Sequence, residues 1–328
     1  MDIGNLLQRS WNVFWKNKAI WVFGIVAAFA GGSDYNVSFR FNVSRPVEPG
    51  EAVLPAQLRD FLTSPALPVI ILVLVAVFLL IGLVFFLVSR LAHGAMIGMA
   101  DEADRTGSTS LGSGWRTGRG KALRLSLIGI LLNLPVLILI IPAVAIFIAS
   151  FLPLILTAEG GRGSAPPEAL MSGMIGAFGC FCSTVCVAVI LGLILTLLDR
   201  FAIRACVLED LGVIASIKRG WRVATGSLGY TVLLWFAFGI IGLIVGAVLA
   251  IPMAALALPA MFSFMESGRF GAQQIVLLLA MLAYGLVAGV VVGGILTSFN
   301  ASAWTLAYRA FADKLTAKTS APAVDTSM

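Results

Sequence analysis

The residues of this chain best able to do chemistry are four cysteines, one acidic pair and a single histidine. Cys182 and Cys186 would share one face of a helix, whereas Cys180 and Cys182 would point about 200° apart. A structural zinc site needs four ligands, commonly including His, and the apolar stretch around these thiols holds neither His nor a carboxylate. Together with Cys206, these cysteines are therefore expected to be small polarizable fillers in a lipid-embedded helix, with no metal or cofactor.

Glu209 and Asp210 are adjacent carboxylates that could serve as a general acid and base. The simpler interpretation is that they cap a helix starting near Leu211 and pair with Arg204 or Arg222. The sequence contains no nucleophile elbow and no metal-binding H-E-x-x-H motif. No catalytic residue is therefore predicted, and enzymatic activity is not expected.

His93 and a glycine-rich run complete the candidates. His93 follows Arg90 by about one turn and could sense pH, but its position just past an apolar run favours an interfacial anchor. The glycines and lysine of residues 112–121 resemble a phosphate loop. That interpretation fails because the Walker spacing is wrong, Ala122 follows Lys121, and no apolar strand precedes the run.

The composition is that of a membrane protein. The chain is 59% hydrophobic and 12% charged, with a mean hydropathy of +1.01, whereas soluble domains average about 25% charged residues. The polar stretches are short, so we expect one membrane domain and no separate soluble one, without a cleavable signal peptide. The net charge of +6 favours anionic lipid headgroups as partners over nucleic acid.

The apolar runs predict an all-α protein with six transmembrane helices, at residues 19–32, 67–89, 123–157, 170–198, 228–258 and 274–299. The first run has only 14 residues, fewer than the roughly 20 that a span needs. It could cross only by borrowing length from its flanks or by thinning the bilayer.

The polar segments predict loops and surface helices. Residues 33–65 predict the longest external loop, with a short strand or hairpin arm at 37–43. Residues 107–120 are a Gly/Ser/Arg-rich connector, and residues 316–328 are expected to be a disordered tail. Residues 3–16 have the spacing of an amphipathic helix.

A second amphipathic helix is predicted at 211–224. Its apolar face would consist of Val213, Ile214, Ile217, Trp221 and Ala224. A basic amphipathic helix between two hydrophobic spans is typical of a helix on the cytoplasmic membrane surface.

Three tryptophans mark an internal repeat. Trp11, Trp115 and Trp221 each precede a predicted span and are separated by 104 and 106 positions. The chain thus predicts three copies of a surface helix, a span out and a span back, at about 3–106, 107–210 and 211–315. Of the 22 Lys and Arg residues, 17 fall in the segments predicted to be inside, so both termini are expected in the cytoplasm.

At 204–222, the run R-x-x-V-L-E-D-L-G followed by R-G-W-R resembles a group of six-span prokaryotic membrane proteins. The group includes the membrane domain that some glycerophosphodiester phosphodiesterases carry beside their catalytic domain. The resemblance implies a membrane domain of the same architecture, largely of unknown function. Phosphodiesterase activity is not implied, because no hydrophilic stretch approaches the roughly 250 residues of the soluble barrel.

Three groups of residues are predicted to serve the membrane. The expected lipid-headgroup contacts are Arg116, Arg119, Lys121, Lys218, Arg219 and Arg222. The expected interfacial anchors are Trp11, Trp115 and Trp221. The expected helix-packing glycines are Gly242, Gly246, Gly285, Gly289 and Gly293, because glycines four apart let another helix approach closely.

These observations favour a multi-pass protein of the cytoplasmic membrane that organises lipids or partner proteins. A passive transporter or channel for a lipid or small amphiphile is the alternative, and an enzyme acting on headgroups lacks any motif. No ionisable residue lies deep inside a predicted span, which weighs against ion-coupled transport. Oligomeric state and protein partners stay open.

The predicted topology can be tested by labelling. In a chain whose native cysteines are replaced by serine, Ser44→Cys and Thr319→Cys should lie on opposite sides of the membrane, because the positive charges gather on one side. A membrane-impermeant maleimide should label only one of them in sealed vesicles. Labelling of both from the same side would contradict the topology.

Overall fold

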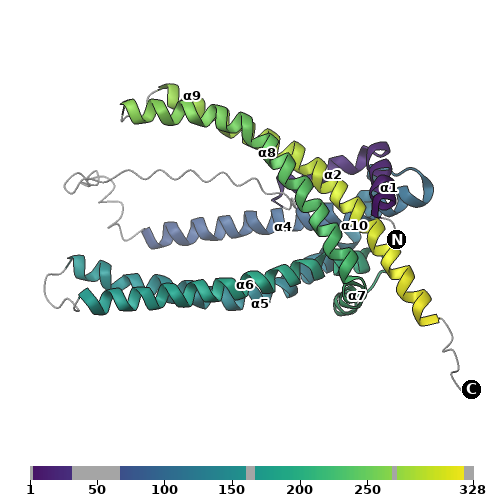
Figure 1. Cartoon of the computed structure of the whole chain (residues 1–328), viewed down its shortest axis with the longest axis horizontal. Helices are drawn as coiled ribbons and strands as arrows, with labels where there is room; N and C mark the ends of the chain where they lie inside the picture. Colours follow the sequence, from purple (N-terminus) through teal and green to yellow (C-terminus); the bar gives the residue numbers. More distant parts are fainter. Residues whose placement is uncertain (1–2, 32–66, 160–166, 268–271, 321–328) are drawn as a thin grey trace, which may run out of the picture. The chain divides into compact units, whose positions relative to one another are not determined.

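The computed structural model describes residues 3–31, 67–159, 167–267 and 272–320, and every regular element within these ranges is a helix (Figure 1). The external loop predicted at 33–65 and the strand predicted at 37–43 lie outside the described residues. The chain divides into two compact units. Unit 1 comprises Met1–Gly120 with Leu233–Ala303, and unit 2 comprises Lys121–Val232 with Trp304–Met328.

The two N-terminal helices are short. Helix α1 spans Ile3–Lys16, which confirms the helix predicted there, and α2 spans Ala19–Phe29. The 11 residues of α2 extend about 16 Å, roughly half the 30 Å thickness of a hydrocarbon core. Gly31, at φ +74°, follows its end. This helix is therefore too short to cross a membrane unaided.

The remaining helices are α4 (Leu67–Thr106), α5 (Leu111–Glu159), α6 (Pro167–Leu208), α7 (Val213–Gly226), α8 (Leu228–Ser267), α9 (Ala272–Val287), the π-helix η1 (Ala288–Val292) and α10 (Gly293–Ser320). Five stretches among the described residues are long and apolar enough to cross a membrane: Leu72–Thr106, Leu111–Ser150, Ile175–Leu208, Leu228–Pro259 and Ile275–Leu315. Over the described residues the protein is thus all-α, with five candidate spans.

Two sequence predictions at helix ends are wrong. The connector predicted at 107–120 is already helical from Leu111, and α5 runs on without a break. Its glycines signalled flexibility, but they allow close packing: a Cβ on Gly118 would lie 2.5 Å from the Leu91 carbonyl oxygen. Likewise α10 continues to Ser320, beyond the predicted start of the disordered tail.

In unit 1, α2 packs against the C-terminal half of α4. Ile20, Phe23 and Ala27 of α2 join Met96 and Met99 of α4 in one buried apolar cluster. Phe29, at the far end of α2, lies 5.9 Å from Phe85 between ring centroids. The two helices therefore run antiparallel. Burying these side chains contributes roughly 1.5–3 kcal/mol for each large residue.

Helix α2 also touches α10 at a point where two glycines meet. A Cβ on Gly294 would lie 2.6 Å from the Cα of Ile25, and one on Gly24 would lie 2.3 Å from the Gly294 carbonyl oxygen. Ser298 Oγ donates to the carbonyl oxygens of Gly294 and Ile20, at 2.9 and 3.2 Å. The two backbones are thus nearly in contact.

Two of the five glycines predicted to pack against another helix, Gly289 and Gly246, do not make such a contact. A Cβ on Gly289 meets no heavy atom within 4 Å in the described chain, and the same holds for Gly246. Gly289 lies inside η1, where the i→i+5 hydrogen bonding of a π turn shifts the phase of a four-residue ladder. A sequence pattern that assumes an unbroken α-helix therefore points to the wrong glycine.

The two other antiparallel pairs are α8 with α9–α10, and α5 with α6. In unit 1, the Tyr284 hydroxyl donates to the Leu249 carbonyl oxygen at 3.1 Å. In unit 2, Phe147 and Phe181 stack with centroids 4.6 Å apart. In Figure 1, α5 and α6 run alongside each other, as do α8 and α9.

The aromatic cluster of unit 2 gathers around Phe201 of α6. Trp304, Tyr308 and Phe311 of α10 lie 5.7, 6.3 and 6.5 Å from it between ring centroids. The Arg200 guanidinium stands over the Trp304 ring at 5.5 Å. This cluster fixes the end of α10 against the end of α6.

The long helices bury only one part of their length. In α4 the buried residues begin at Ser89, whereas most of the apolar side chains before it are exposed. A continuous exposed apolar surface of this size is unusual for a soluble monomer. It suits helices whose apolar segments face lipid.

The glycine contact gives a stability prediction. Gly294→Ala should lower the free energy of unfolding in detergent by about 1–3 kcal/mol, because its methyl group would press on the α2 backbone. Gly289→Ala is the matched control, since open space surrounds it and alanine favours a helix by up to about 1 kcal/mol. Thermal unfolding of the purified variants measures both. Equal melting temperatures would show that the two backbones tolerate a methyl group between them.

Candidate functional site

Helix α7 has two different faces. Ser216, Gly220, Val223 and Ala224 are buried, and a Cβ on Gly220 would lie 2.7 Å from the Ala202 backbone nitrogen of α6. Small residues at this crossing let α7 lie directly on the backbone of α6.

The predicted apolar face is therefore split. Ala224 faces the protein, whereas Ile214 and Trp221 are 65% and 52% exposed. The small residues Ser216 and Gly220 make the contact with α6, so α7 does not pack on the protein through the whole of its predicted apolar face. The large apolar side chains are left to face the surroundings.

Arg219 points into the protein, unlike the other cations of α7. Its Nε donates to Glu209 Oε2 at 3.0 Å, and the Tyr308 hydroxyl donates to Glu209 Oε1 at 2.5 Å. Burial lowers the pKa of Arg219. The hydrogen bond to Glu209 and the negative charge of Glu209 raise that pKa by more than burial lowers it, so the pKa of Arg219 lies above its ordinary value. We call Glu209, Arg219 and Tyr308 the carboxylate clamp.

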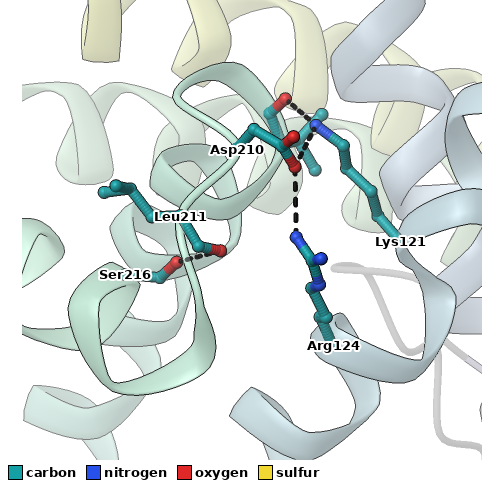
Figure 2. Close-up of polar contacts among 6 residues, drawn as sticks. Lys121, Arg124, Asp210, Leu211 and Ser216 are labelled. Atoms are coloured by element: carbon teal, nitrogen blue, oxygen red, sulfur yellow. Dashed lines mark hydrogen bonds and ion pairs between the residues drawn. The ribbon is translucent and has the colours of Figure 1, made fainter.

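Asp210 forms a second polar contact at the same turn (Figure 2). Its Oδ1 lies 3.3 Å from Lys121 Nζ and 3.1 Å from an Arg124 guanidinium nitrogen. Lys121 Nζ also donates to the Val207 carbonyl oxygen at 2.7 Å. Asp210 has φ +51°, a left-handed conformation that Asp adopts more readily than most residues. The turn after α6 is thus fixed by α5.

These contacts correct the roles predicted for the acidic pair. The helix begins after Gly212, whose extended backbone carries no side-chain cap, so neither carboxylate caps α7. Glu209 and Asp210 instead tie the end of α6 to three neighbouring helices. Sequence reasoning missed Tyr308, Lys121 and Arg124 as partners because they lie 86 to 99 positions away in the chain.

The six predicted headgroup contacts fall into two groups. Arg116, Arg119, Lys218 and Arg222 are exposed, whereas Arg219 and Lys121 are engaged by Glu209 and Asp210. The three predicted anchors are all about half exposed: Trp11 at 48%, Trp115 at 53% and Trp221 at 52%.

A hollow of about 510 Å³ lies between α6 and α7 in unit 2. It is lined by Leu198, Ile217, Lys218, Trp221, Arg222 and Thr225. The Thr225 hydroxyl donates to backbone carbonyl oxygens of its own helix, at 2.9 Å from Trp221 and 3.3 Å from Arg222. The charged groups of the lining are the cations of Lys218 and Arg222.

Within the described part of the chain, no group of three or more His, Cys, Asp or Glu could hold a metal ion. A model of the Family of unknown function (DUF7544) matches residues 16–303. The chain belongs to this family. No curated protein and no solved structure matches the chain. The resemblance to the phosphodiesterase-associated membrane domain stays a prediction.

In this DUF7544 chain, the residue two positions before each of Trp11, Trp115 and Trp221 binds a carboxylate. Arg9 Nε donates to Asp104 Oδ1 at 2.7 Å, and Ser113 Oγ donates to Glu102 Oε2 at 2.6 Å. Arg219, bound to Glu209, holds the third such position. The acidic residues near the ends of α4 and α6 were the sequence signal for these contacts.

The carboxylate clamp can be tested by exchanging its charges. Glu209→Arg and Arg219→Glu should each destabilise the DUF7544 chain by roughly 1–3 kcal/mol, because each leaves a partly buried charge without its hydrogen-bonded partner. The double variant should recover part of that loss, since the opposite charges face each other again. Thermal unfolding measures all three.

Asp313 is an exposed acidic residue on α10. The variant Asp313→Asn serves as the control for the loss of a carboxylate outside the clamp. A double variant no more stable than the sum of its two single changes would rule out a direct Glu209–Arg219 interaction.

Proposed function

We propose that this chain is a multi-pass protein of the cytoplasmic membrane that organises anionic lipids through its basic helices, without catalysing a reaction. The observation that carries the proposal is the outward position of Lys218, Arg222 and Trp221 on α7. An exposed tryptophan beside exposed cations suits the interface, where the ring lies at headgroup depth and the cations near phosphates.

The same combination recurs at the start of α5. Trp115 is about half exposed, and Arg116 and Arg119 lie exposed beside it. Each cation near an anionic leaflet contributes roughly 1 kcal/mol of attraction, weakened by salt. Four such cations on one protein would enrich anionic lipids around it, which is a physical basis for organising lipid without chemistry.

The contacts of α1 support a topology with both termini on the cytoplasmic side. Trp11 and Phe14 lie 5.5 and 5.6 Å from Phe299 between ring centroids, and Arg9 pairs with Asp104. Helix α1 thus lies beside α10 close to where the apolar run of α10 ends, and beside the last turn of α4. The 17 positive charges of the predicted inside segments point the same way.

We also propose that the three antiparallel pairs are copies of one unit, with α2 as a shortened outward helix in place of a full sixth span. Two contacts support this. Gly118 of α5 approaches the backbone of α4, and Gly220 of α7 approaches the backbone of α6 at the matching Leu91 and Phe201–Ala202 positions. The second is that the residue two positions before each of the three tryptophans binds a carboxylate.

The proposed lipid association can be tested on the exposed cations. Changing Arg116, Arg119, Lys218 and Arg222 together to Gln should reduce the excess of anionic over zwitterionic lipid that accompanies the protein, because four attractions of roughly 1 kcal/mol each are removed. Arg219 and Lys121 are kept, since their loss would break structural contacts. Mass spectrometry of lipids extracted with the protein in polymer-bounded discs provides the measurement.

The control changes Arg40, Arg45, Arg162 and Arg269 to Gln, which removes the same charge from the predicted outer loops. We expect this control to keep the anionic excess. If the quadruple cytoplasmic variant also keeps it, the cations serve only to set topology and the proposed function is wrong.

A further inference from the structure

We infer that the hollow between α6 and α7 is a binding site for one anionic glycerophospholipid of the inner leaflet. This inference rests on the proposed function and makes it specific, because it assigns one lipid to one place. Three features favour this occupant: the level in the membrane at which the hollow opens, the chemistry of its lining, and the apolar surface that continues from it along α6.

The position of the hollow matches the depth of a lipid phosphate. Leu198 is the last apolar residue of α6 before the charged pair Asp199 and Arg200, so the hollow lies where this helix changes from apolar to polar. Trp221, half exposed on the opposing wall, has the amphipathic ring that favours the same depth. The hollow therefore opens at the membrane interface.

Its lining combines positive charge with apolar surface. Lys218 and Arg222 are one helical turn apart on α7, so their cationic groups can reach one phosphate together. Arg can bind phosphate through two parallel hydrogen bonds. Ile217, Trp221 and Leu198 supply the apolar remainder. A soluble anion would leave that apolar surface in water, whereas a phospholipid covers both parts.

An exposed apolar stripe continues from the hollow along α6. Val187, Ile190 and Ile194 are each about half exposed or more, and they fall on the same side of the helix as Leu198, which is itself buried. From Val187 to Leu198 the helix rises about 16 Å, close to half of a hydrocarbon core about 30 Å thick. The stripe thus offers an acyl chain one continuous surface across its leaflet.

Arg219 does not belong to this site, although it lies between Lys218 and Arg222 in sequence. Its guanidinium is bound to Glu209 on the other side of α7. This difference matters for the experiment, because removing Arg219 would disturb the carboxylate clamp and mask an effect on lipid. The two lining cations can be changed without touching the clamp.

The experiment titrates the full-length protein with phosphatidylglycerol or phosphatidylcholine and counts bound lipids by native mass spectrometry in mild detergent. The intact chain should bind one phosphatidylglycerol more tightly than any further one. K218Q/R222Q should weaken that first binding step about tenfold or more. The matched control R116Q/R119Q removes the same charge outside the hollow and should change it less than about threefold.

A second variant fills the hollow and keeps both cations. Thr225→Trp, at an exposed position, should abolish the first binding step while the melting temperature stays near that of the intact chain. Soluble glycerol phosphate should not compete with phosphatidylglycerol, because it cannot use the apolar lining.

Four outcomes would overturn the inference. Equal loss in K218Q/R222Q and R116Q/R119Q would mean that charge attracts lipid without a defined site, which leaves the proposed function standing. Unchanged binding in Thr225→Trp would mean that the hollow is not used. Competition by glycerol phosphate would indicate a phosphate site, and a dimer that Thr225→Trp dissociates with lipid binding intact would indicate a second copy as the occupant.

Discussion

The structure depends on helices that touch backbone to backbone because a side chain is missing at the crossing. At Gly118, Gly220 and Gly294 an added Cβ would lie within 2.5 to 2.7 Å of a neighbouring backbone atom. Within a bilayer the lipid tails are as apolar as the side chains, so the hydrophobic effect does not drive helices together. Close van der Waals contact of this kind is then a main source of attraction between helices. The glycines therefore decide which helices pair, and the pairing decides which side chains are turned outward.

The outward face of α7 follows directly from this constraint. Since Gly220 and Ser216 occupy the contact with α6, the helix cannot rotate to bury Trp221 or Ile214. Arg219 is carried towards Glu209, while Lys218 and Arg222 stay on the outer edge. The three basic residues of α7 thus acquire two different roles from the one orientation of the helix: one cation stabilises the fold and two are available to the membrane.

Much of the architecture could be predicted because long apolar runs and a helical spacing are local signals. The helix at 3–16 follows from its amphipathic spacing, and the long apolar helices after residue 67 follow from hydropathy. Contacts between distant positions could not be predicted: Lys121 with Asp210, Tyr308 with Glu209, and Gly24 with Gly294 join residues 89 to 270 positions apart. The glycines of 112–120 misled for a related reason, since close packing and flexibility use the same residue and only the neighbour distinguishes them.

The shortness of α2 has a consequence for biosynthesis. Eleven apolar residues are a weak signal for insertion, and the partner that holds Gly24 is Gly294, near the other end of the chain. At about 5–20 residues per second of translation, α2 waits on the order of tens of seconds before α10 exists. One of the first helices made is therefore among the last to be secured, and α4 must shield its apolar side during that interval.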